Sequence, residues 1–581
     1  MRIGLLRLGA DRQTPFTAIR KRLFQPGSSL PMVNRQIRAS ARFRHFVEFT
    51  LLAALAVLLV EVPAHAKSQS PNIIVFVADD LGWADPGFRG GPIETPTLDS
   101  LARDGMEFER FYTTPICSPT RAALHTGRDP VRLGIVYNTI MAWHNNGVHP
   151  DERFMPEAFR DAGYQTAMVG KWHLGHAQQT YHPNARGYEH FYGHLHTEVG
   201  YFPPFSVQGG KDFQRNGKSI KAEGYETFTL ANEASRWIKE RDASRPFFLY
   251  LPFIAPHTPL EATDDLLAKY ADLVDDRPPA RSKFTDASRR IAKMMKRPSS
   301  RPVYAAVVDG MDQAMGQVLA AVDEQGIRDN TVVLFLSDNG GAAYASAGAN
   351  NAPFRGGKGE TYEGGIRVVA LMRWPAKIAP GTKVPDIVSV MDVFPTLAGA
   401  AGVEPGNTRK LDGRNLWPQL ASGKRIPLDR KLFFAAEMTV PGTLMVTAFD
   451  EEWKLVQRIV QTQLKTEVTN HLFQIADDPY EYANLADAHP EVVAQFSAEI
   501  VRWRSLHPIG GTPRGIVPPP GWRAPKQWAT YPRPIDALQA EPAPGMSPPA
   551  LRTMLDRQHG EQGRLIYDSD LCASDVGGFC K

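Results

Sequence analysis

Cys117 and Arg121 stand four residues apart in a segment that is typical of a loop entering a short helix. Pro119 suits the first turn of a helix, and Gly127 suits the residue just past its last turn. Cys117 then lies at the helix N-terminus, where free backbone N–H groups favour negative charge. Arg121 follows one turn later on the same face. A reactive side chain beside a fixed cation predicts a site that attacks an anionic group.

Further polar residues follow the ends of predicted strands. They are Asp79 with Asp80, Lys171 with His173, His257, and Asp338 with Asn339. In parallel sheets, sites form beyond the carboxyl ends of the strands, so we expect these side chains to meet. Lys358 joins the set because it lies among glycines, which let the backbone approach a ligand closely.

The two acidic pairs predict a metal site. Asp79, Asp80, Asp338 and Asn339 provide three carboxylates and one amide oxygen. Hard oxygen ligands favour Ca²⁺ or Mg²⁺ over a soft metal, and carboxylates that repel one another need a cation between them. The alternatives are a helix cap at the first pair and a turn at the second. Because both pairs end buried strands, we favour the metal.

Lys171 and His173 are two residues apart, so in an extended segment both point to one face. A lysine binds an anionic oxygen as a point charge, and a histidine can take and return a proton. Each residue also has a purely structural alternative. These alternatives are a hydrogen-bonded core histidine for His173, a loop histidine for His257 and a solvated loop lysine for Lys358.

Strands and helices alternate along the part of the chain that carries these residues. The predicted strands are residues 72–77, 165–169, 246–253, 331–336 and 366–372. The predicted helices are residues 97–104, 155–161, 227–241, 304–324 and 391–401. Continuous apolar runs are typical of strands buried in a parallel sheet. The pattern indicates an α/β fold with a large, mostly parallel central sheet flanked by helices.

The pattern changes near residue 430, where short strands replace the alternation, and a helix follows at residues 490–506. We therefore expect a main domain at residues 67–430 and a smaller C-terminal α+β subdomain at residues 431–507. Residues 508–581 are rich in Pro and Gly and contain few apolar runs. We expect them to form an extended, poorly packed tail.

The first 66 residues contain ten basic and three acidic residues, although the whole chain carries a net charge of only +4. The nearly neutral remainder argues against nucleic acid as a partner. Arg42 and Arg44 precede an apolar run at residues 49–60 and an Ala-x-Ala exit, which predicts a signal peptide cleaved after Ala66. An uncleaved anchor is the alternative, but this run is short for a membrane span.

Cysteine usage agrees with export. If Cys117 is used for chemistry, Cys572 and Cys580 are free to pair in an oxidising compartment, and two unpaired thiols are the alternative. Met32 is an alternative start of the chain. We expect a periplasmic or secreted protein with no stable membrane span after cleavage.

The pattern Cys-x-Pro-x-Arg at residues 117–121, extended to Gly127 and Arg128, resembles the signature of the sulfatases. Other landmarks of that family stand in the family's order over about residues 71–500. They are Leu81-Gly82-Trp83, residues 170–175, residues 337–341 and Gly364-Gly365. The spacing of the early motifs and residues 188–193 look most similar to the arylsulfatase B-like, N-acetylgalactosamine-4-sulfatase-like branch.

The resemblance implies an alkaline-phosphatase-like sulfatase fold and hydrolysis of aryl or carbohydrate sulfate monoesters. It implies that a formylglycine-generating enzyme oxidises Cys117, and that the hydrated aldehyde attacks sulfur to give a sulfated enzyme intermediate. Ca²⁺, with Mg²⁺ as the alternative, would be bound by Asp79, Asp80, Asp338, Asn339 and residue 117. Arg121 and Lys171 would hold the formylglycine, His257 and Lys358 would hold the sulfate, and His173 would accept a proton.

Two other functions remain open. One is a phosphodiester or phosphonate monoester hydrolase of the same superfamily, since some such relatives also use formylglycine. The other is a non-catalytic, exported sugar-binding protein that keeps an unmodified Cys117. For any of these functions, including the sulfatase, we expect substrate specificity to lie in residues 141–149 and 194–210.

Overall fold

The structure is a computed structural model that describes residues 70–529, except residues 203–205, 208, 407–408, 438–441, 463, 510 and 514–517. The predicted signal peptide, the alternative start at Met32, and Cys572 and Cys580 lie outside the described residues. Within this described part, no helix is both long enough and apolar enough to cross a membrane.

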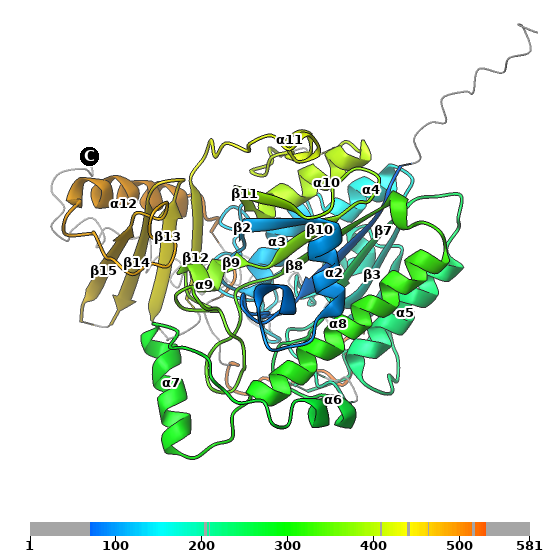
Figure 1. The fold of residues 1–581 in the computed structure, drawn as a ribbon, viewed down its shortest axis with the longest axis horizontal. Coiled ribbons are helices and arrows are strands. Elements are labelled where there is room, and N and C mark those ends of the chain that lie inside the picture. Colours follow the sequence, from blue (N-terminus) through cyan, green and yellow to red (C-terminus); the bar gives the residue numbers. More distant parts are fainter. Residues whose placement is uncertain are drawn as a thin grey trace, which may run out of the picture. The chain divides into compact units, whose positions relative to one another are not determined.

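An 11-stranded sheet forms the centre of the fold, in the order β11-β2-β10-β8-β1-β7-β3-β4-β5-β6, with β9 paired to β2 (Figure 1). The strands are β1 Asn72–Ala78, β2 Met106–Tyr112, β3 Gln165–Lys171, β4 His190–His194, β5 Gln214–Arg215, β6 Lys218–Ser219, β7 Phe247–Pro252, β8 Thr331–Ser337, β9 Arg367–Val368, β10 Ala370–Arg373 and β11 Thr382–Ser389. The middle strands β8, β1, β7, β3 and β4 run parallel, whereas β10 and β5 are antiparallel to their neighbours. The expected α/β fold with a mostly parallel central sheet is confirmed.

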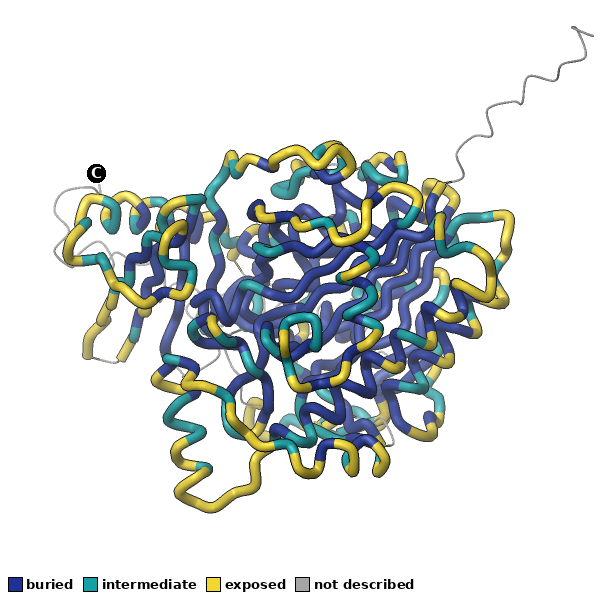
Figure 2. The backbone as a smooth tube through the Cα atoms, viewed as in Figure 1, coloured by how far each residue is buried: buried dark blue, intermediate teal, exposed yellow. Residues whose placement is uncertain are grey.

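Helices cover both faces of this sheet (Figure 1). One face carries α2 (Pro96–Asp104), α5 (Glu226–Glu240), α6 (Asp264–Lys269) and α8 (Arg301–Glu324), and the other carries α3 (Cys117–Thr126), α4 (Met155–Asp161) and α10 (Val393–Ala401). Strand β1 shows why its sequence is apolar throughout. Ile73 and Val75 pack with the α3 side and Ile74 and Phe76 with the α8 side, so both faces of the strand are buried (Figure 2).

The described residues form further helices that do not cover the central sheet. They are α7 Lys283–Met294, α9 Glu363–Ile366, α11 Trp417–Ser422 and α12 Pro490–Arg504. Short 3₁₀ helices are η1 Gly87–Arg89, η2 Gln179–Tyr181, η3 Pro183–Arg186, η4 Arg328–Asn330 and η5 Val390–Asp392.

A second sheet follows in the C-terminal part and runs antiparallel in the order β12-β13-β14-β15. Its strands are β12 Leu432–Ala436, β13 Thr443–Phe449, β14 Lys454–Gln461 and β15 Thr466–Phe473, and α12 packs against β13 and β14. The smaller C-terminal α+β subdomain is confirmed, while its exact boundaries at residues 431 and 507 stay predictions.

The structure differs from the sequence predictions at several strands. Residues 366–372 do not form one strand, because the chain pairs first with β2 as β9 and then with β8 as β10. Strands β2, β4 and β11 were not predicted. Polar residues such as Glu107 in β2 and Lys383 in β11 interrupt the apolar runs on which the prediction depended.

The described part of the C-terminal tail is better packed than the sequence predicted. Trp528 is buried, its ring centroid lies 3.8 Å from that of His196, and its indole N–H donates to the carbonyl of Gly209 at 2.9 Å. Trp522 packs edge-on against Trp143, with 5.8 Å between ring centroids. Isolated tryptophans at wide spacing form no periodic pattern, so the sequence did not signal these contacts.

Candidate active site

Cys117 is the first residue of α3, as predicted. Ile116 before it is extended, and Gly127 after the helix takes a left-handed conformation at φ 64° while its N–H donates to the carbonyl of Ala123. Glycine adopts that conformation without steric cost, which explains why the helix ends there. Every residue of α3 is buried, so Cys117 presents its side chain inside the protein at a helix N-terminus.

Asp79 directly follows β1 and collects three side chains around its carboxylate. Its Oδ1 lies 3.5 Å from Cys117 Sγ, and its Oδ2 accepts from Arg121 at 3.2 Å and from Lys171. Burial alone would raise the pKa of Asp79, but Lys171, His257 and Arg121 lower it well below its usual range. Asp79 is therefore ionised in the folded protein.

The Arg121 side chain contacts residues at the ends of β1, β3 and β8. Its guanidinium donates to Asp338 Oδ2 at 3.0 and 3.2 Å, to Asp79 Oδ2 and to the backbone carbonyl of Lys171 at 3.0 Å. The side chain is 1% exposed. Removing it would leave Asp338 without its cation and Asp79 with Lys171 alone, so we infer that Arg121 positions Asp79 and Asp338.

Asp80 is the centre of the other half of the cluster. Lys358 Nζ lies 2.8 Å from its Oδ1, Asn339 Nδ2 donates to the same oxygen at 2.7 Å, and His257 Nε2 lies 3.7 Å from its Oδ2. Burial opposes the charge of Lys358, yet Asp80 raises the pKa of Lys358 well above its usual range. Asp80 takes a left-handed backbone at φ 74°, which is costly for a residue with a side chain.

The ends of β1 and β8 leave unused capacity for a cation. Asn339 Oδ1 is buried and has no hydrogen-bond partner among the described residues. Burial, together with the neighbouring charges of Asp79 and Asp80, raises the pKa of Asp338 to about 7. Ligand atoms of Asp79, Asp80, Cys117 and His257 all lie within 4.8 Å of one another. An orphaned oxygen acceptor beside crowded carboxylates fits a hard divalent cation.

His257 was not among the predicted metal ligands, although its ring belongs to this close group of ligand atoms. Its Nδ1 hydrogen bonds to the carbonyl of Thr258, so the other ring nitrogen faces Asp80. Burial and the charge of Lys358 lower the pKa of His257.

His173 lies beside α3 and also has a left-handed backbone, at φ 59°. Its Nε2 is 3.2 Å from the carbonyl of Ile140, which assigns the ring proton to that nitrogen. Its Nδ1 is buried without a hydrogen-bond partner among the described residues. Burial and Lys171 lower the pKa of His173 well below its usual range. The ring is therefore neutral and keeps one nitrogen free to accept a proton.

The structure brings all the predicted site residues into one cluster at the carboxyl edge of the central sheet. They are Asp79, Asp80, Cys117, Arg121, Lys171, His173, His257, Asp338, Asn339 and Lys358. His173 joins through its backbone carbonyl, which accepts from Ser118 Oγ at 2.9 Å. The geometry establishes this placement, and the role of each side chain stays a prediction.

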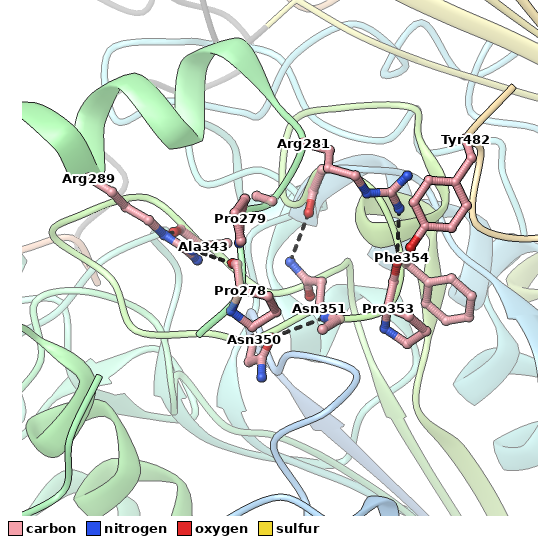
Figure 3. Close-up of a pocket in the computed structure, with 13 residues that line it drawn as sticks. Pro278, Pro279, Arg281, Arg289, Ala343, Asn350, Asn351, Pro353, Phe354 and Tyr482 are labelled. Carbon is pink, nitrogen blue, oxygen red and sulfur yellow. Dashed lines mark hydrogen bonds between the residues drawn. The ribbon is translucent and has the colours of Figure 1, made fainter. Parts of the chain in front are cut away.

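Asn351 is a residue that the sequence did not single out. Its side chain donates to the carbonyls of Gly341 and Gly356 and accepts from the N–H of Gly341, and Lys358 N–H donates to Gly341 as well. Asn351 thus fixes the loop after Asn339 to the loop that carries Lys358. It also lines a cavity of about 330 Å³ (Figure 3). Its sequence context, a loop before Pro353, gave no signal of this role.

Described residues at both segments expected to give specificity contact the cluster. The carbonyl of Ile140, next to the first segment, lies 3.2 Å from His173 Nε2, and Tyr201 of the second segment donates to the carbonyl of His257 at 3.0 Å. The tail adds Trp522 and Trp528 to the same region through their contacts with Trp143 and His196.

Two models of known protein families match the sequence of this chain. A family model described as Sulfatase matches residues 71–403, and one described as N-sulphoglucosamine sulphohydrolase, C-terminal, matches residues 357–505. The first match covers more than half of the chain and includes every residue of the cluster.

Individual relatives agree with this match. N-acetylgalactosamine-6-sulfatase of Homo sapiens is 34% identical over 396 residues, which is 64% of this chain and 69% of the relative. Arylsulfatase J of Mus musculus is 28% identical over 474 residues, 74% of this chain and 75% of the relative. Because both types of sulfatase match, the narrower N-acetylgalactosamine-4-sulfatase-like branch stays a prediction.

Solved structures give the same result. The structure titled as Ps i-CgsB in complex with k-i-k-neocarrahexaose is 32% identical, has a TM-score of 0.65, and is matched over 76% of this chain and 94% of that one. A phosphonate monoester hydrolase of Agrobacterium radiobacter shares the fold at 20% identity and a TM-score of 0.53, over 75% and 96% of the two chains. The chain belongs to the sulfatase family and is a sulfuric ester hydrolase.

Proposed function

We propose that the protein hydrolyses sulfate monoesters of carbohydrates or aryl alcohols, with formylglycine formed from Cys117 and with Ca²⁺ in the site. The observation that carries this proposal is the position of Cys117 at a buried helix N-terminus, 3.5 Å from Asp79. Burial and Asp79 raise the pKa of the Cys117 thiol well above its usual range. An unmodified thiol here is protonated and a poor nucleophile, which supports chemistry through a modified side chain.

The residues present fit a divalent cation. Asp79, Asp80, Asp338, Asn339 and residue 117 would hold it, and Mg²⁺ is the alternative to Ca²⁺. The cluster holds three carboxylates against the three cations Arg121, Lys171 and Lys358. A bound divalent ion would add the positive charge that a sulfate ester needs as its oxygens become more negative in the transition state.

Formylglycine, when hydrated, supplies two hydroxyl groups on one carbon, so that one can accept the sulfuryl group and the other can lose a proton as sulfate leaves. The chain's own residues do the rest. Lys171 and Lys358 provide fixed positive charge for the sulfate oxygens. His173 accepts a proton at its free Nδ1, and His257 or Lys358 protonates the departing alcohol.

Carbohydrate esters are the favoured substrates. A relative with 32% identity was solved with an oligosaccharide named in its title, and the N-acetylgalactosamine-6-sulfatases act on a sugar by name. A panel of sulfated mono- and oligosaccharides beside an aryl sulfate tests this preference. Turnover of the aryl ester alone would contradict it.

The phosphonate monoester hydrolase fold provides the second candidate function, although that likeness shows the fold alone. Parallel measurements of kcat/KM on an aryl sulfate, an aryl phosphodiester and an aryl phosphonate separate the two. We expect the sulfate to exceed both others by at least about a hundredfold. A higher value for either phosphorus ester would assign the protein to that alternative.

We also propose that the protein is exported, with residues 1–66 removed as a signal peptide, residues 67–430 as catalytic domain and residues 508–581 as a tail. Maturation by a formylglycine-generating enzyme would precede folding, because Cys117 is 1% exposed in the folded protein. N-terminal sequencing of the exported chain should begin at Lys67. A chain that retains residues 1–66 would contradict cleavage and favour the anchor.

A further inference from the structure

Helix α7 (Lys283–Met294) turns its polar side toward the protein. Ser288 Oγ accepts from the N–H of Ala345 at 3.2 Å, and Arg289 Nε donates to the carbonyl of Ala343 at 2.7 Å. Figure 3 shows Arg289 pointing from the helix toward Ala343 in the wall of the cavity. These hydrogen bonds therefore hold the helix to the loop at residues 343–345.

The apolar side chains of this helix face solvent instead. Phe284, Ile291, Met294 and Met295 are 39%, 56%, 80% and 58% exposed. Their spacing of seven, ten and eleven residues from Phe284 places them along one side of the helix, and we call them the apolar stripe. A surface helix of a globular protein normally buries such a stripe in the core, so this helix is amphipathic in the reverse sense.

Basic side chains border the apolar stripe. Lys283, Arg290, Lys293, Lys296 and Arg297 are all exposed. Asp286 is the single acidic residue in residues 283–297. Its carboxylate accepts from the N–H groups of Ala280 and Ser282, so it is engaged on the protein side. The outer surface of α7 thus combines exposed apolar groups with a dense positive charge.

We propose that the apolar stripe and its basic border dock the protein on an anionic phospholipid surface. A helix that lies in a membrane interface inserts its apolar face at the level of the headgroups and places Lys and Arg among anionic lipids. A second copy of the chain would bring the two positive surfaces together. A soluble sulfated polymer would pair with the charges but leave the apolar stripe in water. The lipid surface accommodates both features.

Docking through α7 would also bring the active-site region close to the lipid surface. The Phe284 ring packs edge-on against Tyr344 with 6.2 Å between centroids, in the loop that follows Asn339. The inner end of the apolar stripe therefore touches this loop, while its outer end is free to enter a membrane.

The test is sedimentation of the full chain, as purified after export, with vesicles. Vesicles of phosphatidylcholine containing about one third phosphatidylglycerol should carry the protein down, and added salt should weaken binding. Vesicles of phosphatidylcholine alone should bind it far less. Failure to sediment with the anionic vesicles at low salt would overturn the proposal.

Two double variants separate the apolar and charged parts. Ile291→Ser with Met294→Ser should weaken vesicle binding at least about tenfold. Lys293→Gln with Lys296→Gln should weaken it about thirtyfold, since each basic residue near an anionic surface contributes about a factor of five. None of these residues lies in the catalytic cluster, so turnover of a small soluble sulfate ester should equal wild type and report correct folding.

Matched controls lie on other parts of the surface. Val501→Ser removes an equally exposed apolar side chain from α12, and Lys377→Gln with Lys424→Gln removes two exposed lysines elsewhere. These controls should bind vesicles as wild type does. Equal losses in stripe and control variants would contradict the proposal. The proposal would also be contradicted if the protein did not bind vesicles but bound a sulfated polysaccharide or formed a concentration-dependent dimer, and if the α7 variants abolished that binding or that dimer.

Discussion

Two buried clusters of acids and lysines can be compared within the described residues, and their difference shows how a structural cluster differs from an active site. In one cluster, which we call the Lys454 cluster, Lys454 Nζ lies 2.7 Å from Glu363 and 2.9 Å from Glu481. Tyr112 donates to the second oxygen of Glu363, and the N–H of Glu363 donates to the second oxygen of Glu481. Three of the four carboxylate oxygens accept a hydrogen bond, and Glu481 Oε1 meets Lys454 Nζ as an ion pair, so this cluster fastens α9 to β14.

The active-site cluster also contains buried acids and lysines, but some of its polar atoms remain available to a ligand. Asn339 Oδ1 and His173 Nδ1 are buried without hydrogen-bond partners among the described residues, and four ligand atoms converge within 4.8 Å. Backbone strain does not distinguish the two clusters, since Glu481 has a positive φ as Asp80 does. The convergence of ligand atoms from four side chains, and not strain or burial, therefore distinguishes the active-site cluster from the Lys454 cluster.

The largest expected effect is at Cys117. Cys117→Ser should lower turnover of a sulfate ester by at least about a thousandfold, because a serine hydroxyl lacks the second hydroxyl that releases sulfate. The thermal midpoint should stay within a few degrees of wild type, since Sγ makes a single long contact to Asp79. Turnover at the wild-type rate would contradict the role given to this residue.

Removal of divalent metal should impair the active-site cluster and leave the Lys454 cluster unaffected. Dialysis against a strong chelator should lower activity at least about a hundredfold, and Ca²⁺ or Mg²⁺ should restore it, because the ion would add positive charge for the sulfate ester beyond the three protein cations. Metal analysis provides the control. Full activity in a preparation that contains no divalent metal would show that the reaction does not need the ion.

The Lys454 cluster should respond in the opposite sense. Lys454→Ala leaves buried Glu481 without its cation and Glu363 with only Arg367 at 3.5 Å, and should lower the free energy of unfolding by about 3 to 5 kcal/mol. Activity per folded molecule should stay unchanged, as measured by active-site titration. Lys465→Ala, beside strand β15, is the matched control, because that lysine pairs with Glu467 on the surface and should be nearly neutral. If Lys454→Ala lowered the activity per folded molecule, the Lys454 cluster would have a functional role.

The sequence could predict most of the cluster because its members lie at recognisable boundaries of strands and helices, and Lys358 lies among glycines. Asp79 and Asp338 end apolar strands, and Cys117 begins a helix that Gly127 ends. It could not predict Asn351 or Trp528, whose contacts depend on loops brought together from distant parts of the chain. It also missed strands such as β2, where polar side chains hide an otherwise buried strand.

The smallest expected effect concerns a buried acid outside both clusters. Burial raises the pKa of Glu226 to about 8, and His194 at 3.8 Å has its own pKa lowered to about 3 by burial, so it brings no charge. The folded protein keeps a proton on Glu226 that the unfolded chain releases above its ordinary pKa. Wild-type stability should therefore fall as pH rises toward 8.

Glu226→Gln removes this dependence. Relative to wild type, the variant should gain about 2 to 4 kcal/mol between pH 5 and pH 8, as measured by chemical unfolding at both values. Glu233→Gln serves as a control at a carboxylate on the same helix that is paired with Arg215 and Arg236. An equal difference between Glu226→Gln and wild type at the two pH values would mean that Glu226 is ionised throughout.

The central claim is that residue 117 carries an aldehyde in the working enzyme. Mass spectrometry of the peptide containing residue 117, from exported protein whose sulfate ester turnover has been measured, tests it most directly. We predict that the peptide carries a carbonyl oxygen in place of the thiol, and that activity rises in proportion to the converted fraction. A fully retained thiol in a preparation with full turnover would contradict the account.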